Sequence, residues 1–133
     1  MRLLLDTHIW LWGLLEPERL APDVRAALQS PDNELWLSPI SVWEACVLAE
    51  RGRLSLAAGT SSAAWIQQMV AGIPRREAPL THEIAMVSRR LELPHQDPAD
   101  RFLAATARVL DLTLVTADER LQHSDEFAVL ANR

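Results

Sequence analysis

The sequence contains a short run of three leucines, Leu3–Leu5, which ends at Asp6. Consecutive apolar side chains without polar alternation are typical of a strand that is buried on both faces, as in a parallel sheet. The following stretch, Thr7–Leu15, is apolar almost all round and stops before Pro17, which predicts a buried helix. A buried strand that leads into a buried helix favours an α/β fold.

The rest of the chain repeats this alternation of strand and helix. We predict further strands at Glu34–Leu37, Arg75–Ala78, Leu112–Val115 and Phe127–Leu130, and helices at Ala21–Ser30, Pro39–Arg51, Ala63–Ala71, Thr81–Leu91 and Ala99–Leu110, with a helical turn at Asp118–Leu121. No internal repeat or linker interrupts them. We therefore expect residues 1–133 to form one three-layer α/β/α domain with a central parallel sheet.

The charged residues exclude several functions. All 13 basic residues are arginine, against 18 acidic residues, and the formal net charge is −5. The absence of lysine excludes Schiff-base chemistry and a phosphate-binding loop lysine, and it argues against a phospho-aspartate receiver or a haloacid-type phosphatase. The acidic balance argues against a nucleic-acid binder that relies on bulk positive potential.

Cysteine content and hydropathy bear on location. Cys46 is the single cysteine, so no disulfide forms within the chain. Asp6 and His8 interrupt the apolar start, which therefore does not resemble a secretion signal. No run approaches the roughly 18 apolar residues of a membrane-spanning helix. We expect a cytoplasmic protein with no membrane segment.

Acidic residues occupy positions where α/β folds bind ligands. Asp6 follows the first predicted strand, and Asp118 follows the strand at Leu112–Val115. Ligands of such folds bind at the carboxyl ends of the strands. Glu44 is the one polar residue in the segment VWEACVL, and a buried carboxylate is costly unless it is paired or bound to metal.

Each of these acids also has a structural interpretation. Asp6, Asp97 and Asp118 each precede a predicted helix or helical turn and suit an N-cap, which is the role we favour for Asp97. Asp100 suits the first turn of its helix because of the helix dipole. Glu44 lies beyond capping range of Ser38.

A cluster of these carboxylates would repel itself unless a proton or a cation relieved the repulsion. A site built from oxygen atoms, without Cys or paired His, selects Mg²⁺ or Mn²⁺ over Zn²⁺. Carboxylates that hold such cations are the apparatus of metal-assisted phosphodiester hydrolysis.

Four segments together resemble the PIN-domain ribonucleases, and more narrowly the VapC-type toxins of bacterial toxin–antitoxin pairs. In order they are residues 3–7 (LLLDT), 38–44 (SPISVWE), 97–107 (DPADRFLAATA) and 114–118 (LVTAD). The resemblance spans nearly the whole chain. It implies an α/β/α domain, Mg²⁺- or Mn²⁺-dependent cleavage of RNA, a homodimer, and inhibition by a cognate VapB-type antitoxin.

The resemblance also assigns site residues. It implies that Asp6, Glu44, Asp100 and Asp118 are the catalytic, metal-binding acids, with Asp118 at the position where the family varies most. Four further residues are supporting candidates: Thr7 and Thr116 through their hydroxyl groups, Asp97 as an assisting acid, and Arg101, which either holds substrate phosphate or pairs with a neighbouring carboxylate.

We hypothesise that Asp6, Glu44 and Asp100 hold Mg²⁺ directly or through water, while Asp118 completes the site or positions the attacking water. Single-stranded or loop RNA is the expected substrate because its splayed backbone can reach a pocket. A housekeeping PIN nuclease that works without an antitoxin and a non-catalytic PIN-like binding domain remain alternatives.

Aromatic residues mark a possible interface. We expect most of the five tryptophans and Met69 to lie in the core. Trp65 follows a loop of small residues and is a candidate anchor, since aromatic residues are enriched at interface hot spots. We predict that the region Trp10–Leu20 and the Ala63–Ala71 helix form part of a dimer or antitoxin surface.

The remaining cations have simpler interpretations. Arg51, Arg89 and Arg90 lie at predicted helix ends, where they offset the helix dipole, and Arg75–Arg76 forms another basic cluster. His8 and His95 lie two or three residues from the predicted site acids, where either could donate a hydrogen bond to them; a lone histidine is more often structural, so we assign neither a catalytic function.

Overall fold

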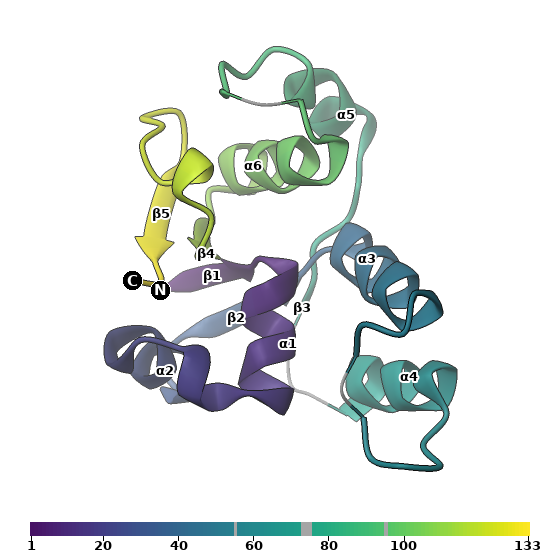
Figure 1. Ribbon diagram of the computed structural model, residues 1–133. Coiled ribbons are helices and arrows are strands. Elements are labelled where there is room, and N and C mark those ends of the chain that lie inside the picture. Colours follow the sequence, from purple (N-terminus) through teal and green to yellow (C-terminus); the bar gives the residue numbers. More distant parts are fainter. Residues whose placement is uncertain (55, 73–75, 95) are drawn as a thin grey trace.

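Five parallel strands form one sheet within the part of the chain that the computed structural model describes, residues 1–54, 56–72, 76–94 and 96–133 (Figure 1). The strands are β1 (Arg2–Leu5), β2 (Glu34–Leu37), β3 (Arg76–Glu77), β4 (Thr113–Thr116) and β5 (Ala128–Ala131). Their order is β3-β2-β1-β4-β5. In β1, Leu3 pairs with Leu35 on one side and with Thr113 on the other. The strand order therefore reverses beside β1, where such folds open a crevice.

Helices cover both faces of the sheet (Figure 1). They are α1 (Thr7–Leu15), α2 (Pro22–Gln29), α3 (Pro39–Glu50), α4 (Ser62–Gly72), α5 (His82–Ser88) and α6 (Pro98–Leu110), with short 3₁₀ helices η1 (Pro17–Arg19) and η2 (Glu119–Leu121). Leu3 and Leu5 belong to the core shared with α1 to α4, whereas Leu4 belongs to the core shared with α5 and α6. The expectation of a three-layer α/β/α fold, with a strand buried on both faces at Leu3–Leu5, is confirmed.

Most predicted elements agree with the observed bounds to within one residue. The helix at Thr7–Leu15 and the strand at Glu34–Leu37 agree to the residue, whereas β4 and β5 each lie one residue further along the chain than predicted. The helix predicted at Thr81–Leu91 was wrong at its end, because α5 stops at Ser88. The strand predicted at Arg75–Ala78 is reduced to Arg76–Glu77, and Arg75 lies outside the described residues.

A capping hydrogen bond determines where α3, the helix that carries Glu44, begins. The Ser38 hydroxyl oxygen accepts a hydrogen bond from the backbone N–H of Ile40 over 3.1 Å, so Ser38 is the cap of α3 and Pro39 is its first residue, as predicted. Gly52 follows the helix with a φ of 66°, a conformation that favours glycine. None of the described helices is long and apolar enough to cross a lipid bilayer.

Candidate functional site

Asp6 lies at the carboxyl end of β1 and is the N-cap of α1. Its Oδ1 accepts a hydrogen bond from the backbone N–H of Thr7 over 2.7 Å, and its Oδ2 accepts one from the hydroxyl of Thr116 over 2.7 Å. The residue is only 7% exposed. Burial raises the pKa of Asp6, and the hydrogen bond from Thr116 offsets part of that rise. Asp6 therefore both caps the helix and presents a buried carboxylate, so its two interpretations are compatible.

Glu44 lies half-buried on α3 and reaches the start of α1. Its Oε1 accepts a hydrogen bond from the Thr7 hydroxyl over 2.5 Å. Burial is the main cause of a raised pKa at Glu44; the bond from Thr7 lowers that pKa, and the charge of Asp6 raises it. Thr7 thus joins two of the predicted site acids, by a backbone donor to Asp6 and a hydroxyl donor to Glu44.

The start of α6 brings two more acids to this position. Asp97 is the N-cap, and its Oδ1 accepts hydrogen bonds from the backbone N–H groups of Ala99 over 3.0 Å and of Asp100 over 3.4 Å. The capping role favoured for Asp97 is what the structure displays. Asp100 lies in the first turn, and its negative charge raises the pKa of both Asp6 and Glu44. These mutual effects place Asp100 within electrostatic range of the other two acids.

Asp118 caps η2 beyond β4 and is bound by Arg120. The Arg120 guanidinium donates to Asp118 through Nε over 3.1 Å and through Nη2 over 2.9 Å, and Nη2 lies 3.8 Å from Asp100 Oδ2. The hydrogen bond to Asp118 raises the pKa of Arg120. Sequence reasoning missed Arg120. The spacing Asp118-x-Arg120 within a helical turn was the available indication of this pair.

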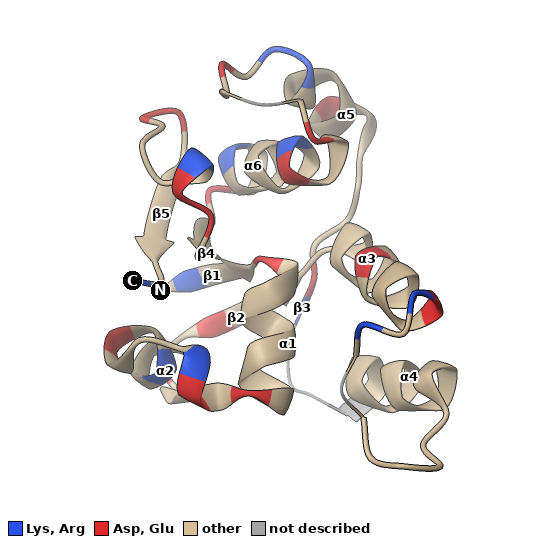
Figure 2. Ribbon diagram, viewed as in Figure 1, with Lys and Arg blue, Asp and Glu red and all other residues tan. Residues whose placement is uncertain are grey.

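The acids approach one another from different elements: the end of β1, the middle of α3, the start of α6 and the loop after β4. Figure 2 shows acidic positions at the start of α1, on α3 and at the start of α6. Like charges so placed favour a proton or a cation. Within the described ranges, no three His, Cys, Asp or Glu side chains are already close enough to surround one ion.

The donor set fits a hard cation that keeps part of its water. Its atoms are carboxylate and hydroxyl oxygens, which Mg²⁺ and Mn²⁺ prefer. Mg²⁺ commonly keeps several waters and contacts only one or two carboxylates, so an open arrangement is compatible with it. Burial, and to a smaller extent the charge of Asp100, raises the pKa of Asp6 and of Glu44, and a bound cation would offset both effects.

The Arg101 guanidinium binds backbone carbonyl groups, a role that was not predicted from the sequence. The residue is 4% exposed, and its guanidinium donates to the backbone carbonyl of Ser88 over 2.8 Å and to that of Leu91 over 2.5 Å. Arg101 therefore ties α6 to the segment that follows α5. These bonds also explain why α5 ends at Ser88, since the chain turns there to present both carbonyls to Arg101.

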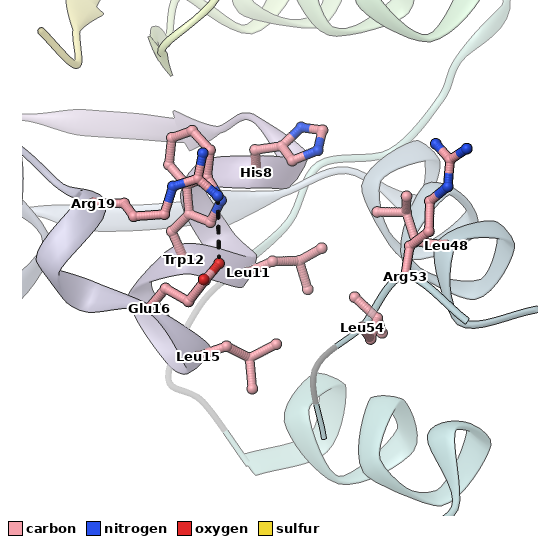
Figure 3. A pocket seen from close by; sticks show the side chains of 9 residues that line it. All are labelled: His8, Leu11, Trp12, Leu15, Glu16, Arg19, Leu48, Arg53 and Leu54. Carbon is pink, nitrogen blue, oxygen red and sulfur yellow. Dashed lines mark hydrogen bonds and ion pairs between the residues drawn. The ribbon is translucent and has the colours of Figure 1, made fainter. Parts of the chain in front are cut away.

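The two histidines differ in what the structure records. His8 is exposed at the start of α1, and its charge lowers the pKa of Asp6. The other histidine considered, His95, lies outside the described residues. His8 also lines a cavity of about 240 Å³ beside α1, together with Trp12 and Arg19 (Figure 3).

The predicted interface region is partly wrong. Trp10 and Leu20, at its two ends, are 3% and 5% exposed and belong to the core, so they offer no surface to a partner. Trp12 and Trp65 are half-buried and pack against that core. The guanidinium of Arg19 lies 4.1 Å from the ring centroid of Trp12, and Arg19 pairs with Glu16 over 3.5 Å (Figure 3). Trp12, Glu16 and Arg19 of this region line the cavity beside α1, whereas the exposed residues Gly13, Pro17 and Glu18 do not.

Trp43 departs from the expectation that the tryptophans are core residues. It is 58% exposed on α3, next to Glu44. Ser41 and Ala45 are fully buried, and this orientation of the helix turns position 43 outward. The helical spacing of these three positions was the available indication that Trp43 lies on the outer face.

Comparison with known proteins bears on the family and the fold. The family model for the PIN domain matches residues 3–126. The chain is 37% identical over 122 residues to ribonuclease VapC22 of Mycobacterium tuberculosis, a match that covers 90% of this chain and 88% of the relative. VapBC2 of Rickettsia felis, bound to a DNA fragment from its promoter, superposes with a TM-score of 0.70 at 13% identity over the full length of both chains. A toxin–antitoxin complex from Klebsiella pneumoniae superposes with a TM-score of 0.65 at 18% identity, covering 96% of this chain and 95% of the other.

Proposed function

The chain belongs to the PIN domain family, and from that premise we propose that it is a metal-dependent endoribonuclease, the toxin of a bacterial toxin–antitoxin pair. The observation that carries the proposal is the electrostatic coupling of three acids. Asp6 and Glu44 each have a pKa raised by burial and by the charge of Asp100, although the three residues come from different elements. Acids so placed favour a bound cation, which would relieve their repulsion.

Asp6, Glu44 and Asp100 would hold Mg²⁺ or Mn²⁺, directly or through water. Such a cation, when bound, makes water a better nucleophile and stabilises charge on the leaving oxygen during phosphodiester hydrolysis. Thr7 and Thr116 would keep the Asp6 and Glu44 carboxylates in place through the hydrogen bonds described above. Asp118, which pairs with Arg120, would complete the site or position the attacking water.

RNA is the proposed substrate and an antitoxin the proposed partner. The mycobacterial relative is named a ribonuclease, and solved structures that share this fold include toxin–antitoxin complexes. The cavity beside α1, between Trp12 and Leu54, is the surface that we propose for the antitoxin, and Trp12 and Arg19 of the region predicted from sequence line it (Figure 3). A homodimer and a cytoplasmic location accompany this proposal.

Induced expression in a bacterial host tests the function. We expect growth arrest and discrete new RNA ends with wild-type protein, and neither with Asp6→Asn, which removes one charge at nearly constant shape. Asp32→Asn is a matched control, because Asp32 is an exposed carboxylate before β2, at the opposite end of the sheet. Equal RNA cleavage by wild type and Asp6→Asn would disprove the assignment.

Purified protein separates the alternatives. Cleavage that requires added Mg²⁺ or Mn²⁺ and stops with EDTA would exclude a non-catalytic binding domain. A small neighbouring gene whose product binds the protein and blocks cleavage would identify the toxin, whereas full activity without growth arrest would indicate a housekeeping nuclease.

A further inference from the structure

Trp43 is the most exposed tryptophan of the chain and lies beside a site acid. Trp10 is buried, and Trp12, Trp36 and Trp65 are half-buried, whereas Trp43 is 58% exposed. A large aromatic surface left in water forgoes the free energy of burial. Structural packing therefore does not account for Trp43, and the ring is available to a ligand.

The ring of Trp43 lines a cavity that opens at the candidate site. The cavity has a volume of about 480 Å³, within the range of ligand pockets. Its wall includes Glu44 and Asp97 from the acidic cluster and, on the apolar side, Trp43, Ile40 and Phe102. One wall thus combines two acids of the cluster with two aromatic rings from different helices.

Two neighbouring positions on α3 supply both parts of this arrangement. The packing of Ser41 and Ala45 into the protein fixes the rotation of α3, so Trp43 and Glu44 project together toward the cavity. Arg51, one residue beyond the end of α3, lies at the same cavity and supplies a cation suited to phosphate. The cavity therefore offers an apolar wall, a cation and direct continuity with the acids.

We propose that Trp43, with Phe102, forms a stacking subsite for an unpaired nucleobase of the RNA next to the scissile phosphate. The inference rests on the proposed function, because it needs the scissile phosphodiester to lie at the cation that Asp6, Glu44 and Asp100 would hold. A phosphate in that position brings its adjacent nucleotide to the cavity, since Glu44 borders both. Unpaired bases stack on aromatic side chains and on arginine, and stacking tolerates any base.

A nucleotide fits the charge of the cavity better than an apolar peptide side chain does. An apolar side chain would make no use of the cation at the cavity, Arg51, whereas a phosphate group pairs with a guanidinium. A nucleotide presents its base to Trp43 and its phosphate to Arg51. The subsite would therefore make Trp43 a substrate-positioning residue, and it would favour single-stranded RNA over a duplex, whose bases are already stacked.

Binding and cleavage by three variants test the subsite. Trp43→Ala removes the ring, Trp43→Phe keeps a stacking surface, and Met86→Ala removes a comparably exposed apolar side chain on α5 that does not line the cavity. Affinity is measured in the Asp6→Asn background with a single-stranded RNA that contains the cleavage site. Matched RNAs lack the base of one nucleotide on either side of that site.

We expect Trp43→Ala to weaken RNA binding by about 5- to 150-fold and to raise KM more than it lowers kcat. Trp43→Phe is expected to recover much of the loss, and Met86→Ala to behave as the parent protein. Removal of one particular base should weaken binding to the parent protein but not to Trp43→Ala, because the two changes delete the same contact.

The results distinguish this inference from the proposed function. If wild type cleaves RNA with Mg²⁺ but Trp43→Ala binds as tightly and shows the same penalty for base removal, the subsite is wrong and the nuclease assignment stands. If Trp43→Ala weakens only the complex with the antitoxin, the cavity is a protein-docking site instead. Failure of the wild type to bind or cleave any RNA with Mg²⁺ would overturn both.

Discussion

The Thr116 hydroxyl donates a hydrogen bond to Asp6 over 2.7 Å and accepts one from the backbone N–H of Asp118 over 3.0 Å. One buried side chain therefore links the carboxyl ends of β1 and β4 and the loop that carries the fourth acid. The strand order reverses between β1 and β4, so the crevice of the fold and this hydroxyl coincide. Thr116 holds the Asp6 carboxylate in a fixed orientation and partly offsets the effect of its burial.

Thr116→Val is expected to lower the free energy of unfolding by roughly 2 kcal/mol, because it leaves a buried carboxylate and a backbone N–H without this partner. It also removes a bond that lowers the pKa of Asp6, so the acidic limb of the cleavage–pH profile should move to higher pH. Urea unfolding and a pH series of cleavage rates measure the two effects. Thr116→Ser keeps the hydroxyl and should retain the wild-type pH profile; an unshifted profile in Thr116→Val would contradict the link.

Asp6→Asn should separate activity from stability. Loss of a proposed metal ligand is expected to reduce cleavage by at least about 100-fold, since even outer-shell changes cost 10- to 100-fold. In the absence of divalent metal the variant should be no less stable than wild type, because a neutral amide is easier to bury beside Asp100 than a carboxylate. Cleavage rates and thermal unfolding in EDTA measure both. A markedly lower unfolding temperature would show that the charge of Asp6 serves the fold.

The pH dependence of stability follows from the raised pKa values of Asp6 and Glu44. In the unfolded chain, Asp6 and Glu44 release their protons at the ordinary pKa values of 3.8 and 4.5. The folded protein retains these protons to higher pH. Stability therefore falls as the pH rises from that range through the raised pKa values, and it is regained as the pH falls. The other carboxylates contribute in their own ways, so a difference between variants isolates this effect.

We accordingly expect the stability difference between Asp6→Asn and wild type, measured without divalent metal, to be larger at neutral pH than near the ordinary aspartate value of 3.8. Denaturant unfolding at a series of pH values gives this difference directly. Added Mg²⁺ should reduce it at neutral pH by stabilising only the wild type. A difference that stayed constant across the pH series would mean that Asp6 titrates normally.

The strands and the acids could be predicted because their determinants are local. A strand buried on both faces must be apolar, as Leu3–Leu5 is, and Asp6 follows directly at its carboxyl end. The position of Glu44 in an apolar helix, and of Asp100 in the first turn of another, was likewise visible in the sequence. The sequence did not show which of these residues lie close together in space, because that depends on the order of the strands in the sheet.

Arg120, Trp43 and the end of α5 could not be predicted with the same reasoning because their environments are set by tertiary packing. Arg120 lies between Asp118, two residues away, and Asp100, which is 20 positions earlier on α6. The exposure of Trp43 depends on how α3 rotates against the rest of the protein. The end of α5 depends on carbonyl groups that bind Arg101 from another helix.

Arg101→Met is expected to destabilise the protein by about 3 kcal/mol, because two backbone carbonyls lose a charged, buried donor. Cleavage per folded molecule should remain close to wild type, since the guanidinium binds Ser88 and Leu91. Arg101→Lys should fall in between, because one ammonium group does not reproduce the fork of the guanidinium. A raised KM with unchanged stability would instead assign Arg101 to substrate phosphate.

Arg120→Gln tests whether the guanidinium of Arg120, which lies beside two of the site acids, competes with Mg²⁺ for them. Arg120 binds Asp118 and lies 3.8 Å from Asp100, so its removal should increase the affinity for Mg²⁺ by roughly fivefold at low salt, through the loss of one nearby positive charge. Stability should change little, because the side chain is 55% exposed.

Arg19→Gln is a matched control, since Arg19 is 52% exposed and pairs with Glu16 instead. Calorimetric titration of each variant with Mg²⁺ measures the affinity. An unchanged or weaker affinity in Arg120→Gln would show that Arg120 holds the acids in a binding arrangement and does not compete with the ion.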